Sequence, residues 1–219
     1  MISGSALDGV ELAAGVVLAG AILALWRKDL RSLTSVLALQ GIALAALAAI
    51  LAATGGDVGL GVVAGVVLVT KGLVIPGLLA RVVRADPGSR ETAPLVNVPA
   101  SLVAAAGLVI LSYLVAGQLT ALMPDPLTRL APLGLATVLV GFFVLVTRRK
   151  AVSQIVGLLL VDNGVALLAF LLTAGVPLLV ELGTSLDVLL VVVVLQVLAT
   201  TMRARFGHVD LDQLRELHD

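Results

Sequence analysis

The sequence contains no cysteine, only two histidines and few charged residues, and each shortage disfavours a class of function. Without cysteine, the chain has no disulfide, no thiol nucleophile and no cysteine ligand for zinc or an iron–sulfur cluster. His208 and His218 both lie near the C-terminal end, which disfavours a histidine-ligated redox cofactor. The 14 Lys and Arg residues match 14 Asp and Glu residues, so there is no excess positive charge to hold nucleic-acid phosphates.

Apolar residues take the place of these missing groups. Of the 219 residues, 60% are hydrophobic and 13% are charged, and the mean hydropathy is +1.16. A soluble domain is about half apolar and about one quarter charged. The composition therefore predicts an integral membrane protein.

Seven apolar stretches are long enough to cross the hydrocarbon core of a bilayer, which takes about 20 helical residues. They are residues 6–26, 33–54, 58–80, 98–118, 126–147, 151–174 and 177–202. None shows the alternation of an outer-membrane β-barrel strand. We therefore predict an all-α integral membrane protein: a bundle of seven transmembrane helices over residues 1–202, followed by a C-terminal tail, residues 203–219.

Basic residues cluster in alternate connections of this seven-helix prediction. They follow the first, third, fifth and seventh stretches and are Arg27, Lys28, Arg31, Arg81, Arg84, Arg90, Arg148, Arg149, Lys150, Arg203, Arg205 and Arg215. The opposite connections carry Arg129 together with Asp8, Glu11, Asp57 and Asp125. By the positive-inside rule, we expect the N-terminus outside and the C-terminus in the cytoplasm.

The two ends of the chain carry further expectations. The first stretch lacks the basic start and the cleavage site of a signal peptide, so we expect it to be retained as a span. The tail spaces Val209, Leu211, Leu214 and Leu217 along one side of a helix. That pattern fits either a helix on the lipid surface or a docking element for a cytoplasmic partner.

Beyond Asp8, Glu11 and Arg129 near the outer ends of the first and fifth stretches, four charged residues fall inside the predicted spans, where each costs about 2.5–3.5 kcal/mol on insertion scales. They are Lys71, Asp162, Glu181 and Asp187. At about 1.5 Å per residue, Lys71 lies roughly 15 Å and Asp162 roughly 18 Å from the basic end of its helix. Their similar depth and opposite charge predict an ion pair, direct or bridged by water.

These charges, with one amide, form a candidate ion path across the membrane. In order of depth, it comprises Glu181 at the outer mouth, then Asp187, Asp162, Lys71 and Gln40. Carboxylates and a lysine amine bind and release protons, which is the chemistry that a proton path needs. The alternative interpretation is structural, because a Lys–Asp pair inside a bundle also locks helices together.

Three weaker signals concern helix geometry. Pro76 predicts a kink with a freed backbone carbonyl near the level of Lys71. Gly61 and Gly65 have the spacing of a close helix contact. The pair Asn163-Gly164 either loosens its helix or permits tight packing.

Two segments of the chain resemble each other. Residues 27–47 and 148–170 each begin with a basic turn, enter an apolar helix, and reach a polar residue followed by glycine. These dipeptides are Gln40-Gly41 and Asn163-Gly164. The similarity is consistent with a duplicated, parallel three-helix unit.

Motifs of enzyme chemistry are missing from the sequence. It contains no Gly-rich phosphate loop, no zinc-protease helix motif and no nucleophile elbow. We therefore expect no catalytic residues, no cofactor and no metal on this chain, and no enzyme activity on its own.

Three segments resemble the E component of hydrogenase-4, a membrane subunit of energy-converting group 4 nickel–iron hydrogenases and formate hydrogenlyases. They are VTKGLVIPGLLARVVR (69–84), RRKAVSQIVGLLLVDNGVALLAF (148–170) and VPLLVELGTSLDVLL (176–190). The last three predicted helices, residues 126–202, are also similar to the K-type subunit of respiratory complex I and to the C subunit of Mrp antiporters. In those relatives, too, the three-helix unit begins outside.

The resemblance implies a non-catalytic, multi-pass subunit of the bacterial or archaeal cytoplasmic membrane. It would sit beside large antiporter-like subunits in a complex that couples redox chemistry to proton or cation pumping, with nickel and iron–sulfur clusters on other chains. The K-type subunit has a glutamate where this chain has Leu159, and Asp162 follows three residues later on nearly the same helix face. The alternatives from other classes are a stand-alone secondary transporter and a purely structural membrane anchor.

Overall fold

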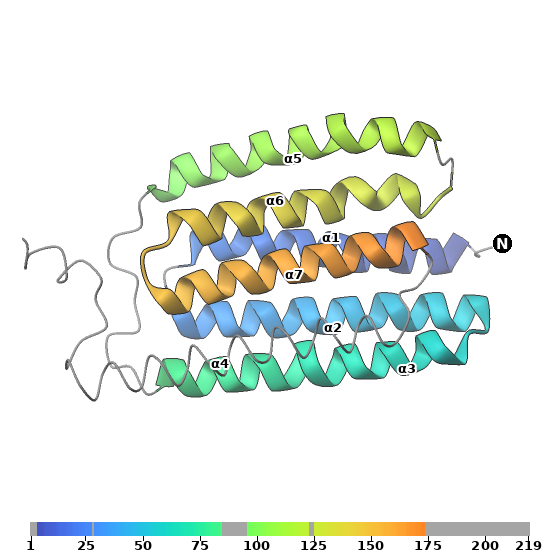
Figure 1. Cartoon of the computed structure of the whole chain (residues 1–219), viewed down its shortest axis with the longest axis horizontal. Helices are drawn as coiled ribbons and strands as arrows, with labels where there is room; N and C mark the ends of the chain where they lie inside the picture. Colours follow the sequence, from blue (N-terminus) through green and yellow to red (C-terminus); the bar gives the residue numbers. More distant parts are fainter. Residues whose placement is uncertain (1–3, 28, 85–95, 123–124, 174–219) are drawn as a thin grey trace, which may run out of the picture.

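The computed structural model describes residues 4–27, 29–84, 96–122 and 125–173. These residues form helices joined by short connections, as Figure 1 shows. The helices are α1 (Gly4–Trp26), α2 (Leu30–Gly55), α3 (Val58–Val67), the π-helix η1 (Leu68–Val74), α4 (Ile75–Arg84), α5 (Val98–Leu122), the 3-10 turn η2 (Thr128–Leu130), α6 (Ala131–Thr147) and α7 (Ala151–Thr173).

Six helical segments in this part of the chain are long and apolar enough to cross a membrane. They are Gly4–Trp26, Leu30–Gly55, Val58–Arg81, Val98–Gln118, Thr128–Thr147 and Val152–Thr173. Each coincides, within a few residues, with one of the first six predicted stretches. The seventh stretch, 177–202, and the tail, 203–219, lie outside the described residues, as do Glu181 and Asp187.

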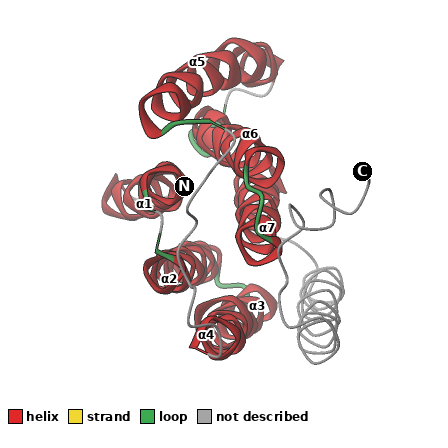
Figure 2. Ribbon diagram, turned by 90° about the vertical axis from the view of Figure 1, so that its left-hand side faces the viewer, coloured by secondary structure: helices red, strands yellow, loops and turns green. Residues whose placement is uncertain are grey.

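The described helices lie side by side along one axis, and α2 lies between α1 and the segment formed by α3 and α4 (Figure 2). It contacts α1 on one side, α3, η1 and α4 on another, and α7 on a third. Helices α6 and α7 form an antiparallel pair, and α5 packs on α6 and on part of α1. The junction of α2, η1 and α7 therefore brings together residues that are far apart in sequence.

The turn between α2 and α3 is specified locally. Gly56 has a φ of 65°, a left-handed conformation that glycine adopts without steric cost, and it ends α2. Asp57 then accepts a hydrogen bond from the Leu60 backbone N–H at 3.2 Å and caps the start of α3. The two helices therefore fold back on each other with a connection of two residues.

Glycines allow α6 and α7 to approach closely. A Cβ atom at Gly157 would lie 2.5 Å from the Leu145 backbone nitrogen, and one at Gly164 would lie 2.6 Å from that of Val138. Gly164 thus permits tight packing, which decides between the two interpretations of Asn163-Gly164. Gly61 and Gly65 do not make the predicted close contact with any helix in the described part of the chain. A Cβ at Gly61 would only reach ordinary contact at 3.9 Å, and one at Gly65 would meet no described atom within 4 Å.

Arg148 ties α6 and α7 to the end of α1. Its side chain is buried, and its Nη2 donates to the backbone oxygens of Ala24 and Leu25, each at 3.0 Å. These carbonyls belong to the last turn of α1, and carbonyls in the last turn of a helix have no backbone N–H donor within that helix. A guanidinium is well suited to this position because it is cationic and carries several donors.

Replacing Arg148 with Met is expected to lower the free energy of unfolding by about 2–3 kcal/mol, because charged hydrogen bonds to two buried carbonyls are lost. Arg149→Met, at the exposed neighbouring position, is the matched control and should change stability by less than about 0.5 kcal/mol. Unfolding in mixed micelles with increasing denaturing detergent measures both. Equal stability of the two variants would show that Arg148 does not cap α1.

Candidate ion-pair site

The third span contains a π-helical segment, Leu68–Val74, with Lys71 in its middle. The Ile75 backbone N–H donates to the Thr70 oxygen, five residues earlier. Pro76 explains the location, because it has no N–H and its ring would clash with the carbonyl four residues earlier in an α-helix. The wider π turn accommodates the proline where the sequence predicted a kink.

Gly41 on α2 lies directly against the backbone of this π segment. A Cβ at Gly41 would meet the carbonyl of Lys71 and would lie 2.6 Å from the Gly72 nitrogen. Only a residue without a side chain fits between the two helices. Gly41 therefore sets how closely Lys71 approaches the centre of the bundle.

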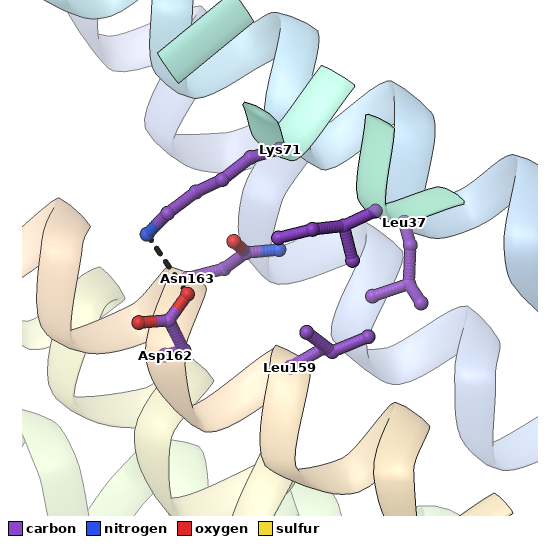
Figure 3. A pocket seen from close by; sticks show the side chains of 6 residues that line it. Leu37, Lys71, Leu159, Asp162 and Asn163 are labelled. Atoms are coloured by element: carbon purple, nitrogen blue, oxygen red, sulfur yellow. Dashed lines mark ion pairs between the residues drawn. The ribbon is translucent and has the colours of Figure 1, made fainter. Parts of the chain in front are cut away.

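Lys71 and Asp162 form the ion pair that their depths predicted. Lys71 Nζ and Asp162 Oδ2 are 2.9 Å apart, and the side chains are 3% and 15% exposed (Figure 3). The pair connects η1 to α7 across the apolar interior of the bundle. A direct contact at this distance offsets much of the cost of burying each charge.

Gln40 lies beside this pair but bonds elsewhere. Its Nε2 donates to the Val17 backbone oxygen at 2.6 Å, and its Oε1 accepts from Asn163 Nδ2 at 3.1 Å. Gln40 is fully buried and Asn163 is 4% exposed. The structure thus joins Gln40 to α1 and α7, whereas the sequence placed it as the inner end of an ion path.

A small pocket adjoins the ion pair. It is lined by Leu37, Lys71, Ile75, Leu159, Asp162 and Asn163, and it has room for about one water molecule. Leu37, Ile75 and Leu159 each lie about one helical turn from the polar residues, toward the end of the bundle that carries Arg81 and Arg148. The pocket is therefore on the basic side of the pair.

Sequence reasoning missed part of this site. Asn163 was considered only for its effect on helix geometry, and no sequence pattern indicated the π segment. The signal for Asn163 was the internal similarity, because the aligned residues Gln40 and Asn163 turn out to be hydrogen-bonded. Among the described residues, no group of three His, Asp or Glu side chains is arranged to hold a metal ion.

Comparison with known proteins found two kinds of relative. The chain is 46% identical over 211 residues to the uncharacterized protein Rv0085 of Mycobacterium tuberculosis, a match covering 96% of each chain. It is 28% identical over 149 residues to hydrogenase-4 component E of Escherichia coli, covering 68% of this chain and 69% of that one. Hydrogenase-4 component E of Shigella flexneri matches equally well. No protein-family model and no solved structure matches the sequence.

Proposed function

We propose that this chain, which belongs to the same family as Rv0085 of Mycobacterium tuberculosis, is a membrane subunit of a hydrogenase-like, ion-translocating complex. It contributes buried charged residues to a proton or cation path and does no redox chemistry itself. The observation that carries the proposal is the ion pair between Lys71 and Asp162, buried where three helices meet. Intramembrane charges are costly and are commonly retained for transport.

The similarity to hydrogenase-4 component E supports the subunit role. It extends over 149 residues, about two thirds of both chains. The name of that relative describes a component of a larger assembly. On this basis the chain's partners are the other subunits of such a complex, among them large antiporter-like membrane subunits, within a bacterial cytoplasmic membrane.

The geometry of the pair supports proton exchange. Passing one proton from Lys71 Nζ to Asp162 Oδ2 converts an ammonium and a carboxylate into an amine and a carboxylic acid, so both charges disappear together. The separation of 2.9 Å between Nζ and Oδ2 is short enough for a hydrogen bond, and the proton passes once the two side chains rotate into line, because their present angles do not form one. A redox event in a partner would favour one form by changing the local field or hydration.

The path on either side of the pair follows from charge and depth. Under the positive-inside rule, the end carrying Arg81 and Arg148 faces the cytoplasm. The pocket, with room for about one water molecule, then lies on the cytoplasmic side of the pair. Asp187 and Glu181 continue the path outward, with Glu181 at its mouth.

A structural anchor is the second candidate, and the same contacts favour it. The ion pair joins η1 to α7. The hydrogen bonds of Gln40 to Val17 and to Asn163, which form an amide bridge, join α2 to α1 and to α7. These contacts tie the helices together whether or not any ion passes. A structural anchor requires these contacts for assembly. A proton relay, in which Lys71 and Asp162 pass a proton along the path, requires their charges for translocation after assembly.

Purification of the tagged protein from its native membrane in a mild detergent, with mass spectrometry of every co-purifying chain, tests the subunit role. We expect large antiporter-like chains together with a nickel or iron–sulfur protein. Antiporter-like chains without a redox partner would restrict the proposal to an ion-exchange assembly. Recovery of this chain folded and alone would contradict it and favour a stand-alone transporter.

A further inference from the structure

We propose that Asn163 and Gln40 form a positioning clamp, in which Asn163 directs its carboxamide oxygen toward the Lys71 ammonium and Gln40 fixes that orientation. The inference rests on the proposed function, because it concerns how the Lys71–Asp162 pair is held in its charged form. It also changes the role of Gln40. A carboxamide does not ionise, and this one acts through Asn163 rather than as a step of the path.

The Val17 carbonyl fixes the direction of the hydrogen bonds that Gln40 and Asn163 make. The Val17 carbonyl only accepts, so Gln40 must turn its NH2 group toward α1. Its own oxygen then faces Asn163 and requires a donor, which is the Asn163 NH2 group. Since the two ends of a carboxamide point in different directions, the Asn163 oxygen is turned away from Gln40.

That oxygen faces the ion pair. Asn163 lines the same pocket as Lys71 and Asp162, and Figure 3 shows its oxygen on the Lys71 side with the nitrogen turned away. The Asn163 oxygen makes no hydrogen bond to Lys71 Nζ, so it acts on the ammonium through the orientation of the amide dipole. An amide dipole whose oxygen is turned toward Lys71 stabilises the ammonium more than the neutral amine.

Close packing prevents the two amides from turning over. A Cβ at Gly20 on α1 would lie 2.8 Å from Gln40 Cγ and 3.0 Å from its Nε2, so α1 backs the glutamine side chain directly. The residue after each amide is also tightly packed: Gly41 lies against the π segment and Gly164 against Val138. Both backbones are therefore fixed where the bridge forms.

The test uses Gln40→Met and Asn163→Leu, which keep approximate side-chain size and remove the bridge. Translocation per assembled complex should fall about fivefold to tenfold in each, as expected for one hydrogen bond. The exchanged double variant, Gln40→Asn with Asn163→Gln, keeps the same number of side-chain atoms across the bridge. It should recover most of the rate.

A spectroscopic measurement separates positioning from structural support. In the purified protein, the infrared carbonyl band of a protonated carboxyl that disappears in Asp162→Asn reports the neutral form of the pair. We expect this band to grow in Gln40→Met and to return to the wild-type intensity in the exchanged variant. If Gln40→Met folds poorly, Asn163→Thr, whose hydroxyl can bond to its own helix, provides the same measurement.

An unchanged band together with an unchanged rate in both single variants would overturn the clamp. A rate that falls only in proportion to the amount of assembled protein, with the band unchanged, would also overturn it. Failure of the proposed function looks different, because Asp162→Asn would then leave translocation at the wild-type level.

Discussion

Replacing Lys71 with Met should lower the free energy of unfolding by about 3–5 kcal/mol, and replacing Asp162 with Leu should do the same, because each leaves the opposite charge buried without its partner. The double variant should recover most of this loss. Two apolar side chains of similar volume suit the surrounding Leu37, Ile75 and Leu159 and avoid the cost of burying two charges.

Unfolding in mixed micelles measures the four proteins of this double-mutant cycle. Arg84→Met is the control for loss of a positive charge, since Arg84 is exposed at the end of α4, and it should change stability by less than about 0.5 kcal/mol. If the two single effects simply add in the double variant, Lys71 and Asp162 do not interact. The ion pair would then have no energetic role in the bundle.

Gly41→Ala should be strongly destabilising, by about 3 kcal/mol or more, which is the upper range for overpacking. The added methyl group would overlap the Lys71 carbonyl and the Gly72 nitrogen. These are backbone atoms of a helix, so no side-chain rotation relieves the overlap. The π segment and α2 must separate, and Lys71 moves away from Asp162.

Gly65→Ala is the matched control, because it makes the same chemical change in the neighbouring span, at a position with no described atom within 4 Å of the new Cβ. It should stabilise the protein slightly, by about 0.5–1 kcal/mol, through the higher helix propensity of alanine. Thermal unfolding of the purified variants compares the two. Similar midpoints for Gly41→Ala and Gly65→Ala would contradict the packing of η1 on α2.

Six spans were predictable from sequence because a bilayer imposes one requirement on every segment: sufficient apolar length with all backbone groups bonded internally. The pairing of Lys71 with Asp162 was predictable for a related reason. Helical rise is regular, so counting residues from the basic flanks placed both charges at similar depth. Opposite charge then selected the partner, and the 2.9 Å contact confirms it.

Helix faces and local irregularities were harder to predict. The π segment directly precedes Pro76 and lies against Gly41, and the sequence predicted a kink at the proline but not the π geometry. Gly61 and Gly65 satisfied a spacing rule but make no close contact with residues that the structure describes, whereas Gly157 and Gly164, seven residues apart, make tight contacts with α6. Arg148 looked like an ordinary cytoplasmic charge, although its side chain is buried against α1.

Translocation by the assembled complex carrying Lys71→Met with Asp162→Leu is the most direct test of the central claim, because this double variant keeps the fold while removing both charges. The subunit should co-purify with its partners in wild-type amounts, and proton or cation translocation should fall at least about tenfold. Wild-type translocation by this variant would contradict the relay and leave the Lys71–Asp162 pair as a structural contact.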